Sequence, residues 1–286
     1  MAMEIFQQRP QPRLQAFVDR FWAWRGAPGE AIRLPTLLPG TGAELFIHAG
    51  RPFSIGDGAG SRQLAPTQLF CLRESRRELL PEHGLDFIAA RFRIGALQRF
   101  LAAPVAEVQD RDCEAGELWG SEAEARVARV CSETDFSRRV GHLEVFLLNC
   151  LHGGHADPLI ETAVAALYNG ERCTRVHALA AAHDLGIRQF ERRFSRMVGL
   201  SPARLRRLVR FQRVVREGLL RLPAARPQLP LLDAALGQGY YDEAHFIRDF
   251  RELAGDTPTR FFRGALGKTH FYNPSRAAIA RVPSVL

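Results

Sequence analysis

The sequence has few cysteines and almost no lysine. Five cysteines are spread over 286 residues, at least 18 positions apart and never as a C-x-x-C pair. A scattered, odd-numbered set of this kind predicts neither a disulfide framework nor a zinc site. The chain shows no other metal, cofactor or catalytic motif, and we expect none.

Long apolar runs are also missing. No stretch approaches the roughly 18 apolar residues that a membrane helix needs. The first residues, MAMEIFQQRPQPR, lack the apolar core of a secretory signal. With 46% apolar residues the chain can nevertheless form packed cores. We therefore expect a cytoplasmic protein without a membrane partner.

The charge is unevenly distributed. Residues 1–170 hold 18 arginines and 21 acidic residues, whereas residues 171–264 hold 18 arginines and only 10 acidic residues. The last 22 residues add Lys268, Arg276 and Arg281 and no acid. The net charge of +8 therefore resides in the C-terminal third, which predicts a polyanionic partner for that part alone. Genome base composition would explain arginine in place of lysine, but not the loss of acidic residues after residue 170.

A turn-rich segment, HGGHADP at residues 152–158, divides the chain. Before it, residues 31–100 alternate short apolar runs with proline and glycine turns, which predicts a small antiparallel β domain. The periodicity becomes helical from Gly95 to Leu151. Beyond the divide we expect helices over residues 158–168, 174–183, 187–198, 202–220, 231–238 and 243–254. The predicted fold is an α+β chain of two domains: a mainly β domain with helices over residues 1–153 and an all-α domain over residues 154–265, followed by a basic tail over residues 266–286.

One short pattern occurs twice in the C-terminal part. FERRFSRMVGLSPAR begins at Phe190 and FIRDFRELAGDTPTR begins at Phe246, and both fit F-x-R-x-F-x4-G-x2-P-x-R. In the first copy Phe190, Phe194 and Met197 fall on one helix face, opposite a polar face. A short helix and a tight turn precede each copy. This order is the helix-turn-helix pattern, whose second helix can enter the major groove of DNA.

The segment between the copies strengthens this interpretation. Arg204 to Arg221 can form one helix about 27 Å long, which would hold the two second helices about one DNA turn, ~34 Å, apart. Its arginines could contact phosphates: Arg204, Arg206, Arg207, Arg210, Arg213 and Arg216. A single amphipathic helix with three arginines more often has one face packed in a core and the other face in solvent than it binds DNA. The matched pair, the basic connector and the local charge together favour a DNA reader.

Residues 172–264 resemble the C-terminal DNA-binding domain of the AraC/XylS family of bacterial transcription regulators. LGIRQFERRFSRMVGLSPARLRRLVRFQRVV and LDAALGQGYYDEAHFIRDFRELAGDTPTRF carry the resemblance. The first turn departs from the family pattern, since Asp184 stands where glycine is usual and Gly186 replaces the usual serine cap. Aspartate tolerates a left-handed turn and glycine is an acceptable cap, so we expect the fold to hold with a looser start to the first recognition helix.

The resemblance implies which side chains read bases: Arg188, Gln189, Glu191 and Arg192 in the first helix, and Glu243, Ala244, His245 and Arg248 in the second. Arg192 and Arg248 could each contact guanine with two hydrogen bonds, and Gln189 could contact adenine in the same way. Glu191 either accepts from cytosine or braces a neighbouring arginine, and His245 contacts either a phosphate or a base. Arg196, Arg207 and Arg251 complete the expected set of DNA contacts.

In the family that the chain resembles, a DNA-binding domain of this kind is joined to a sensing or dimerising domain. Trp24, Phe46 and His48 could line a ligand pocket; in the alternative, the aromatic side chains pack in a core and His48 is hydrogen-bonded or at the surface. Glu44 with His48 is too small a set for a cupin-type metal site. An apolar stripe before the divide is either a dimer face or the surface that covers the β domain: Leu143, Phe146, Leu147 and Cys150.

The predicted function is a non-enzymatic, sequence-specific transcription regulator that a ligand or dimerisation controls through the N-terminal domain. The partners implied are double-stranded DNA, RNA polymerase, a small-molecule effector and a second copy of the chain. Two rivals stay open. One is a basic protein-interaction module that does not read bases. The other is a DNA alkylation repair enzyme, which would need clustered cysteines near the N-terminus, whereas the first cysteine here is Cys71.

Overall fold

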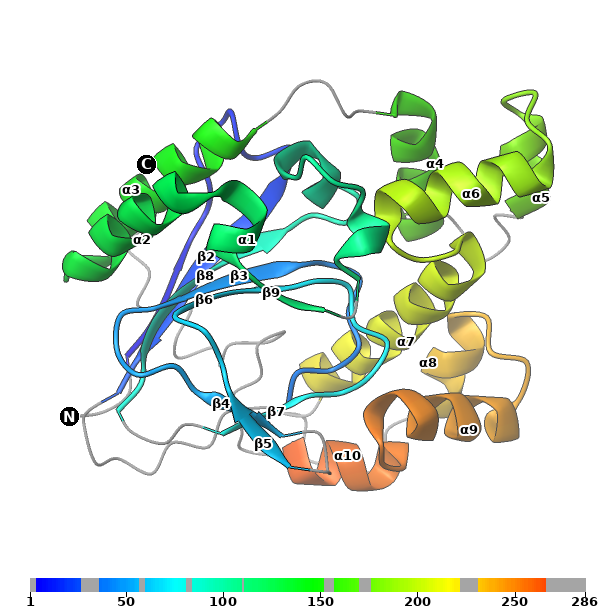
Figure 1. Cartoon of the computed structure of the whole chain (residues 1–286). Coiled ribbons are helices and arrows are strands. Elements are labelled where there is room, and N and C mark those ends of the chain that lie inside the picture. The colour runs from blue at the N-terminus through cyan, green and yellow to red at the C-terminus, as the bar shows by residue number, and fades with distance from the viewer. Residues whose placement is uncertain are drawn as a thin grey trace.

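The computed structural model describes residues 4–26, 36–56, 60–80, 84–109, 111–151, 157–169, 176–221 and 231–265. Within these ranges a β-rich part is followed by a helical part, which lies beside it on the right of Figure 1. The expected fold class, α+β with an all-α C-terminal region, is confirmed. The predicted boundary at residue 153 and the basic tail over residues 266–286 lie outside the described residues.

Two antiparallel sheets form the β part. Six strands are ordered β1-β2-β8-β3-β6-β9 and three are ordered β5-β4-β7. Their bounds are β1 (Glu4–Gln8), β2 (Val18–Arg25), β3 (Glu44–His48), β4 (Ser54–Gly56), β5 (Ser61–Gln63), β6 (Thr67–Phe70), β7 (Glu78–Leu80), β8 (Asp86–Phe92) and β9 (Asp112–Glu114). Strands β1, β2 and β9 lie outside residues 31–100, so that predicted extent of the β domain was too narrow. The aromatic run in β2 lacks the polar alternation that marks a half-exposed strand, because both faces of β2 are covered by apolar clusters.

The central strands of the six-stranded sheet are buried on both faces. Successive side chains of a strand point to opposite faces, so in β2 Phe21 and Ala23 join one apolar cluster while Trp22 and Trp24 join another. The tryptophan cluster includes side chains of the three-stranded sheet, and the other cluster includes side chains of helices α2 and α3. This double burial explains why every residue of β3 is buried.

Three helices follow the strands: α1 (Ala115–Trp119), α2 (Ser121–Ser132) and α3 (Phe136–Cys150), preceded by the short 3-10 turns η1 (Leu97–Phe100) and η2 (Val105–Glu107). The apolar stripe of α3 is buried in the core of its own domain: Leu143, Phe146, Leu147 and Cys150. Arg139 of α3, also buried, bonds both carboxylate oxygens of Asp86 in β8. Of the two interpretations of this stripe, the structure shows the one in which it covers the β domain, and these side chains are not available to a second copy.

The helical part agrees closely with prediction. It comprises α4 (Pro158–Asn169), α5 (Val176–Ala181), α6 (Ile187–Val198), α7 (Pro202–Arg221), α8 (Leu231–Gly237), α9 (Glu243–Ala254) and α10 (Pro258–Ala265). Helix α10 was not expected. It begins at the proline of the second copy of the repeat, as α7 begins at the proline of the first, because proline is well suited to the first turn of a helix.

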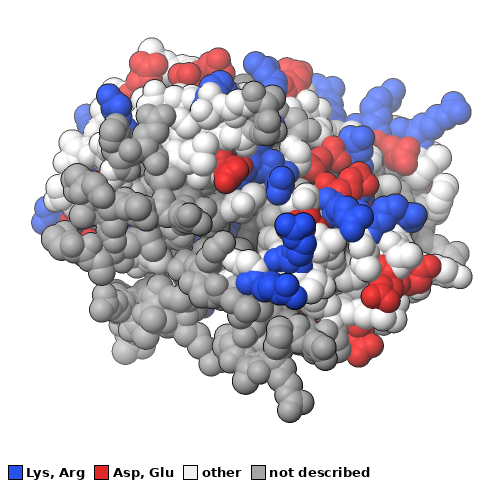
Figure 2. All heavy atoms as spheres, turned by 90° about the horizontal axis from the view of Figure 1, so that it is seen from below, with Lys and Arg blue, Asp and Glu red and all other residues white. Residues whose placement is uncertain are grey.

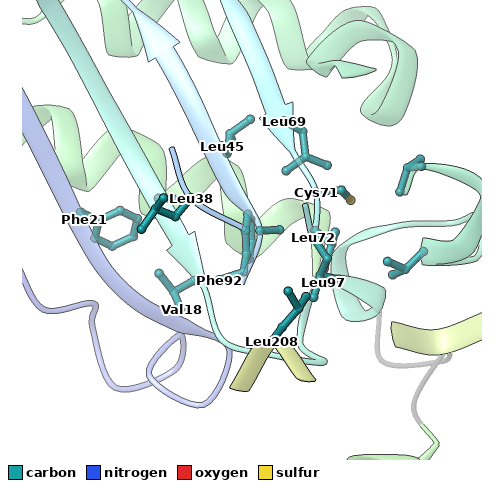
Figure 3. Packing of buried hydrophobic residues seen from close by; sticks show 14 of the residues in the cluster. Val18, Phe21, Leu38, Leu45, Leu69, Cys71, Leu72, Phe92, Leu97 and Leu208 are labelled. Atoms are coloured by element: carbon teal, nitrogen blue, oxygen red, sulfur yellow. The ribbon is translucent and has the colours of Figure 1, made fainter. Parts of the chain in front are cut away.

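The two parts share one core. Leu208 and Phe211 of α7 belong to the same apolar cluster as Leu45 and Phe92 of the six-stranded sheet. Figure 3 shows Leu208 beside Leu72 and Leu97. Two hydrogen bonds cross the same boundary, from Thr41 to Gln212 and from Gln212 to the carbonyl of Pro39. The shared burial fixes α7 against the β part, and α7 in turn carries the two repeated units.

Candidate nucleic-acid interface

The first unit consists of α5, a tight turn and α6. Leu185 N–H donates to the carbonyl of Ala180 at 3.1 Å, and Asp184 takes the left-handed conformation with φ of 53°. A residue other than glycine rarely adopts that conformation, and aspartate is among those that tolerate it best. Gly186 is the N-cap of α6 and provides no side-chain hydrogen bond. The turn forms as expected, and the first helix starts without a side-chain cap.

The second unit repeats this turn with one more residue. Tyr240 N–H donates to the carbonyl of Ala235 at 3.1 Å, and Gly239 takes the left-handed position with φ of 92°. The N-cap of α9 is Asp242, three residues later, and its carboxylate accepts from the backbone of His245 at 2.7 Å. Helix α9 therefore begins with a satisfied cap that α6 lacks.

Helix α6 buries its aromatic face and exposes its basic face. Phe190, Phe194 and Met197 are buried, with at most 5% of each side chain exposed. The sequence-predicted contacts on this helix are all exposed: Arg188, Gln189, Glu191, Arg192 and Arg196. Arg193 instead bonds Asp157, 2.7 Å away just before α4, and so holds α6 in place.

Helix α9 presents a comparable face. Phe246, Phe250 and Leu253 are buried. Among the predicted contacts, Glu243, Ala244, Arg248 and Arg251 are exposed, and His245 is half-buried. Its Nδ1 lies 3.4 Å from the backbone nitrogen of Tyr241, so the ring is oriented by the turn. Ala244, Ile247, Arg248, Arg251 and Glu252 line a shallow hollow on the outer surface of the helix. This hollow combines apolar, cationic and acidic groups.

Helix α7 connects the two units. At 20 residues it is about 30 Å long, and in Figure 1 it lies between α6 and α9. Several of its arginines bond within the protein: Arg204 to Glu74 at 2.9 Å, Arg207 to Asp249 and to Glu252, and Arg213 to the carbonyl of Tyr168. These side chains therefore join α7 to its neighbours, a role that the basic composition of the helix did not indicate.

A polar network on the buried side of α9 was not predicted from the sequence. Asp249 is 6% exposed, accepts from the Tyr240 hydroxyl at 2.7 Å and lies between Arg207 and Arg210. The Arg210 guanidinium lies over the Tyr240 ring, 4.2 Å from its centroid. Burial, and then the Asp249 carboxylate, raise the pKa of Tyr240. The available signal was the position of Asp249 next to Phe250 and three residues after Phe246, which places this acid toward the buried face.

Burial alone would lower the pKa of Arg207, but the hydrogen bonds that Arg207 donates to Glu252 and Asp249 outweigh burial and raise the pKa. Arg207 is therefore a firmly paired cation between α7 and α9. A DNA phosphate at Arg207 would have to compete with these two carboxylates.

Both recognition helices end against the β-rich part. The C-cap of α6 is Gly199 with φ of 84°, where a β-carbon would lie 3.1 Å from Val105 of η2. The C-cap of α9 is Gly255 with φ of 72°, where a β-carbon would lie 2.5 Å from the guanidinium of Arg76. Arg76 also donates to the carbonyl of Ala254 at 3.4 Å. The left-handed conformation at each end favours glycine, and at Gly199 the approach of Val105 leaves little room for a side chain.

The expected ligand residues lie in an aromatic cluster. Trp24, Phe46 and His48 are buried, and the Phe46 ring contacts Phe53, Phe70 and His48. His48 Nδ1 bonds the carbonyl of Pro66 at 3.2 Å, and burial lowers the pKa of His48 to about 4. These three side chains therefore lie together, but they are packed in the core. This is the alternative to a ligand pocket.

The charged surface is mixed rather than uniformly basic. Figure 2, which views the molecule from below, shows basic side chains over its right half, on the side of the C-terminal helices, with acidic side chains between them. In the described residues no group of three or more His, Cys, Asp or Glu side chains could hold a metal ion. No helix in the described part of the chain has both the length and the hydropathy to cross a membrane.

Comparison with known proteins defines the class. Residues 179–264 match a helix-turn-helix domain family, and residues 7–114 match a domain of unknown function (DUF6597). A search of curated proteins found no significant match. The C-terminal part is thus a helix-turn-helix domain of the AraC type. The chain therefore carries the DNA-binding domain of a transcription regulator.

The solved structures that the chain matches are distant in sequence. The C-terminal domain of AraT, a response regulator from Geobacillus stearothermophilus, is 17% identical; the match covers 38% of this chain and 86% of that one, with a TM-score of 0.32. ToxT from Vibrio cholerae O395 is 10% identical over 93% of this chain and 98% of that one, with a TM-score of 0.46. Unsaturated fatty acid bound ToxT from Vibrio cholerae strain SCE256 is 10% identical over 91% and 94%, with a TM-score of 0.43.

Proposed function

We propose that α6 and α9 read two neighbouring major-groove segments on one face of a DNA duplex. The observation that carries this proposal is the repeated unit: two helices, each with buried phenylalanines and an exposed arginine at the same place in the frame, on either side of α7. A helix of about 30 Å can hold two such helices close to one DNA turn apart.

Base readout is assigned to the exposed side chains of the two helices. Arg192 and Arg248 supply bidentate contacts to guanine, and Gln189 supplies one to adenine. Arg196 and Arg251, nearer the end of each helix, supply phosphate contacts, which add salt-dependent affinity without sequence preference. The complete proposed set is Arg188, Gln189, Glu191, Arg192, Arg196, Arg207, Glu243, Ala244, His245, Arg248 and Arg251. Because Arg207 is paired with Asp249 and Glu252, its proposed contribution includes holding α9 in position for readout.

The β-rich part is proposed to control this reader, through a ligand or through dimerisation. Support comes from the ends of the two helices: Gly199, after α6, lies close to Val105 of η2, and Arg76 donates a hydrogen bond to the carbonyl of Ala254 in α9. A shift of the β part would act on both helices at once.

Selection of bound duplexes from a random pool tests the proposal. We expect an enriched site with two conserved blocks about one helical turn apart, and specific duplex should outcompete random duplex by about 10³-fold or more. Equal competition by random duplex would contradict base readout and would favour a basic protein-interaction module. Arg196→Ala should weaken every duplex alike and reduce the slope of affinity against salt.

A further inference from the structure

The turn of the second unit contains one residue more than the turn of the first unit. Leu185 and Tyr240 occupy the same place in the two turns, since the N–H of each donates to the carbonyl of an alanine five residues earlier. In the first turn the N-cap, Gly186, follows Leu185 directly. In the second turn Tyr241 stands between Tyr240 and the N-cap, Asp242. Tyr241 is therefore an insertion that has no counterpart in the first unit.

The inserted tyrosine points away from the protein. Among the large apolar side chains of the described residues, that of Tyr241 is the most exposed, at 87%, whereas its neighbour Tyr240 is 4% exposed. Isolated exposed aromatic residues are common on protein surfaces, so exposure alone does not assign a role. The role follows from where the insertion lies and from how firmly its backbone is held.

The chain is fixed on both sides of Tyr241. Before it, the hydroxyl of the buried Tyr240 donates to Asp249 at 2.7 Å. After it, the carboxylate of Asp242 accepts from the backbone N–H of His245 at 2.7 Å. The backbone nitrogen of Tyr241 itself lies 3.4 Å from Nδ1 of His245. Only the two side-chain torsions of Tyr241 are left to be ordered when it contacts a partner, which keeps the entropic cost of that contact small.

Tyr241 lies just before α9, beyond the end of the helix that we propose to enter the groove. The N-terminal residues of a recognition helix contact base edges, and the proposed base contacts of α9 begin at Glu243. A side chain that precedes the N-cap lies at the rim of the groove, where the sugar-phosphate backbone runs. Half or more of the hydrogen bonds in protein–DNA complexes go to phosphate and sugar, and tyrosine is among their donors.

We propose that Tyr241 is a further DNA contact: its hydroxyl donates to a phosphate oxygen beside the groove that α9 enters, and its ring packs on the adjoining sugar. The proposal rests on the proposed function and adds to it a contact that does not read bases. Because a phenol carries no positive charge, its bond to a phosphate displaces no counterion. Tyr241 therefore adds affinity for every sequence and adds nothing to the salt dependence that the arginines produce.

Binding of the full chain to the selected duplex and to random duplex, over a series of salt concentrations, tests this contact. Tyr241→Phe removes only the hydroxyl and should weaken binding to both duplexes by about two- to tenfold, the range of one neutral hydrogen bond. Tyr241→Ala also removes the ring and should weaken both further. The slope of affinity against salt and the base preference should stay unchanged in both variants, whereas Arg251→Ala should reduce the slope by about one.

Methylphosphonate linkages, each of which replaces one charged phosphate oxygen by a methyl group, locate the phosphate. They are placed one at a time in the backbone beside the second conserved block. At one position the linkage should weaken binding of the natural chain and weaken Tyr241→Phe by less, since the two changes remove the same hydrogen bond. Additive losses at every position would contradict the contact.

Tyr168→Phe is the matched control, because Tyr168 is an exposed tyrosine of α4, outside both recognition helices and their turns. It should bind both duplexes as the natural chain does. Tyr241→Phe should keep the natural urea midpoint, because the side chain is exposed. Natural affinity in Tyr241→Phe, a changed preference at one base, or an equal loss in Tyr168→Phe would overturn the proposal. Equal competition by random duplex would count against base readout alone, since the Tyr241 contact is measured on random duplex as well.

Discussion

At the residue scale, Arg192 and Arg248 carry the proposed sequence preference. Both are exposed on helices whose neighbouring phenylalanines are buried, so replacing them should leave the fold intact. Arg192→Ala and Arg248→Ala should each cost about 1–3 kcal/mol of DNA binding and relax the preference at one base position. Affinity measured on the selected duplex and on its single-base variants checks this.

The matched control for these two variants is Arg129→Ala, which removes an exposed arginine from α2 in the β-rich part. It should change neither affinity nor preference. If Arg192→Ala and Arg248→Ala weakened all duplexes equally, the two arginines would be phosphate contacts and the assignment of base readers would be wrong.

His48 gives a second prediction at this scale. Burial lowers the pKa of His48 from 6.5 to about 4, so the folded protein keeps this ring neutral. Between those two pH values the unfolded chain binds a proton that the folded chain does not, and the free energy of unfolding falls by ~3 kcal/mol as the pH drops through this window. Urea unfolding at several pH values should show a shallower fall for His48→Leu than for the natural chain. Parallel profiles would show that His48 titrates normally in the fold.

At the element scale, the two turns differ in how they start their recognition helices. Gly186 has φ of −63° and open space around its β-carbon position, so a serine fits there without strain. Gly186→Ser should stabilise the start of α6 by a few tenths of a kcal/mol, whereas Asp242→Ala should destabilise α9 by ~1 kcal/mol because it removes the cap. Amide hydrogen exchange in the first turn of each helix measures both effects. No change in α6 on Gly186→Ser would show that its start is already fixed by other contacts.

The helices of the reader could be predicted because local signals agree there. The apolar spacing at Phe190, Phe194 and Met197, the proline that begins α7 and the aspartate before α9 each act within one or two turns of chain. The exposed faces follow from the same spacing. Strand β2 was harder because both of its faces are covered by chain that is distant in sequence, which removes the alternation that marks a strand.

The partners of the arginines could not be predicted from spacing. Arg207 meets Asp249 across 42 positions and Arg204 meets Glu74 across 130 positions, and only the packing of α7 against α9 and against the β part brings these pairs together. A basic stretch in a sequence does not distinguish an arginine that bonds within the protein from one left for DNA. Packing likewise brings residues as far apart in the sequence as Asp19 and Arg216 to the wall of one hollow.

At the scale of the whole molecule, the shared core predicts that the two parts unfold together. Leu208 of α7 is 1% exposed and packs with residues of the β part, so Leu208→Ala should cost ~2–5 kcal/mol. All three tryptophans lie in the β-rich part and helices α1 to α3, at positions 22, 24 and 119. Tryptophan fluorescence and circular dichroism should therefore show the same shift in urea midpoint.

The control is Leu236→Ala, which truncates an exposed leucine of α8 and should move neither transition appreciably. If Leu208→Ala lowered the helical signal while the fluorescence transition stayed in place, the β part would be stable by itself and the contact with α7 would not couple the two parts.

The central claim is that one rigid chain holds both recognition helices on the same face of DNA, and changing the spacing of the selected site tests it most directly. Inserting about 5 base pairs, half a helical turn, between the two conserved blocks moves one block to the opposite face. Affinity should fall to that of a site with one block destroyed, and Arg248→Ala should then cause no further loss. Full affinity for the lengthened site would contradict the claim.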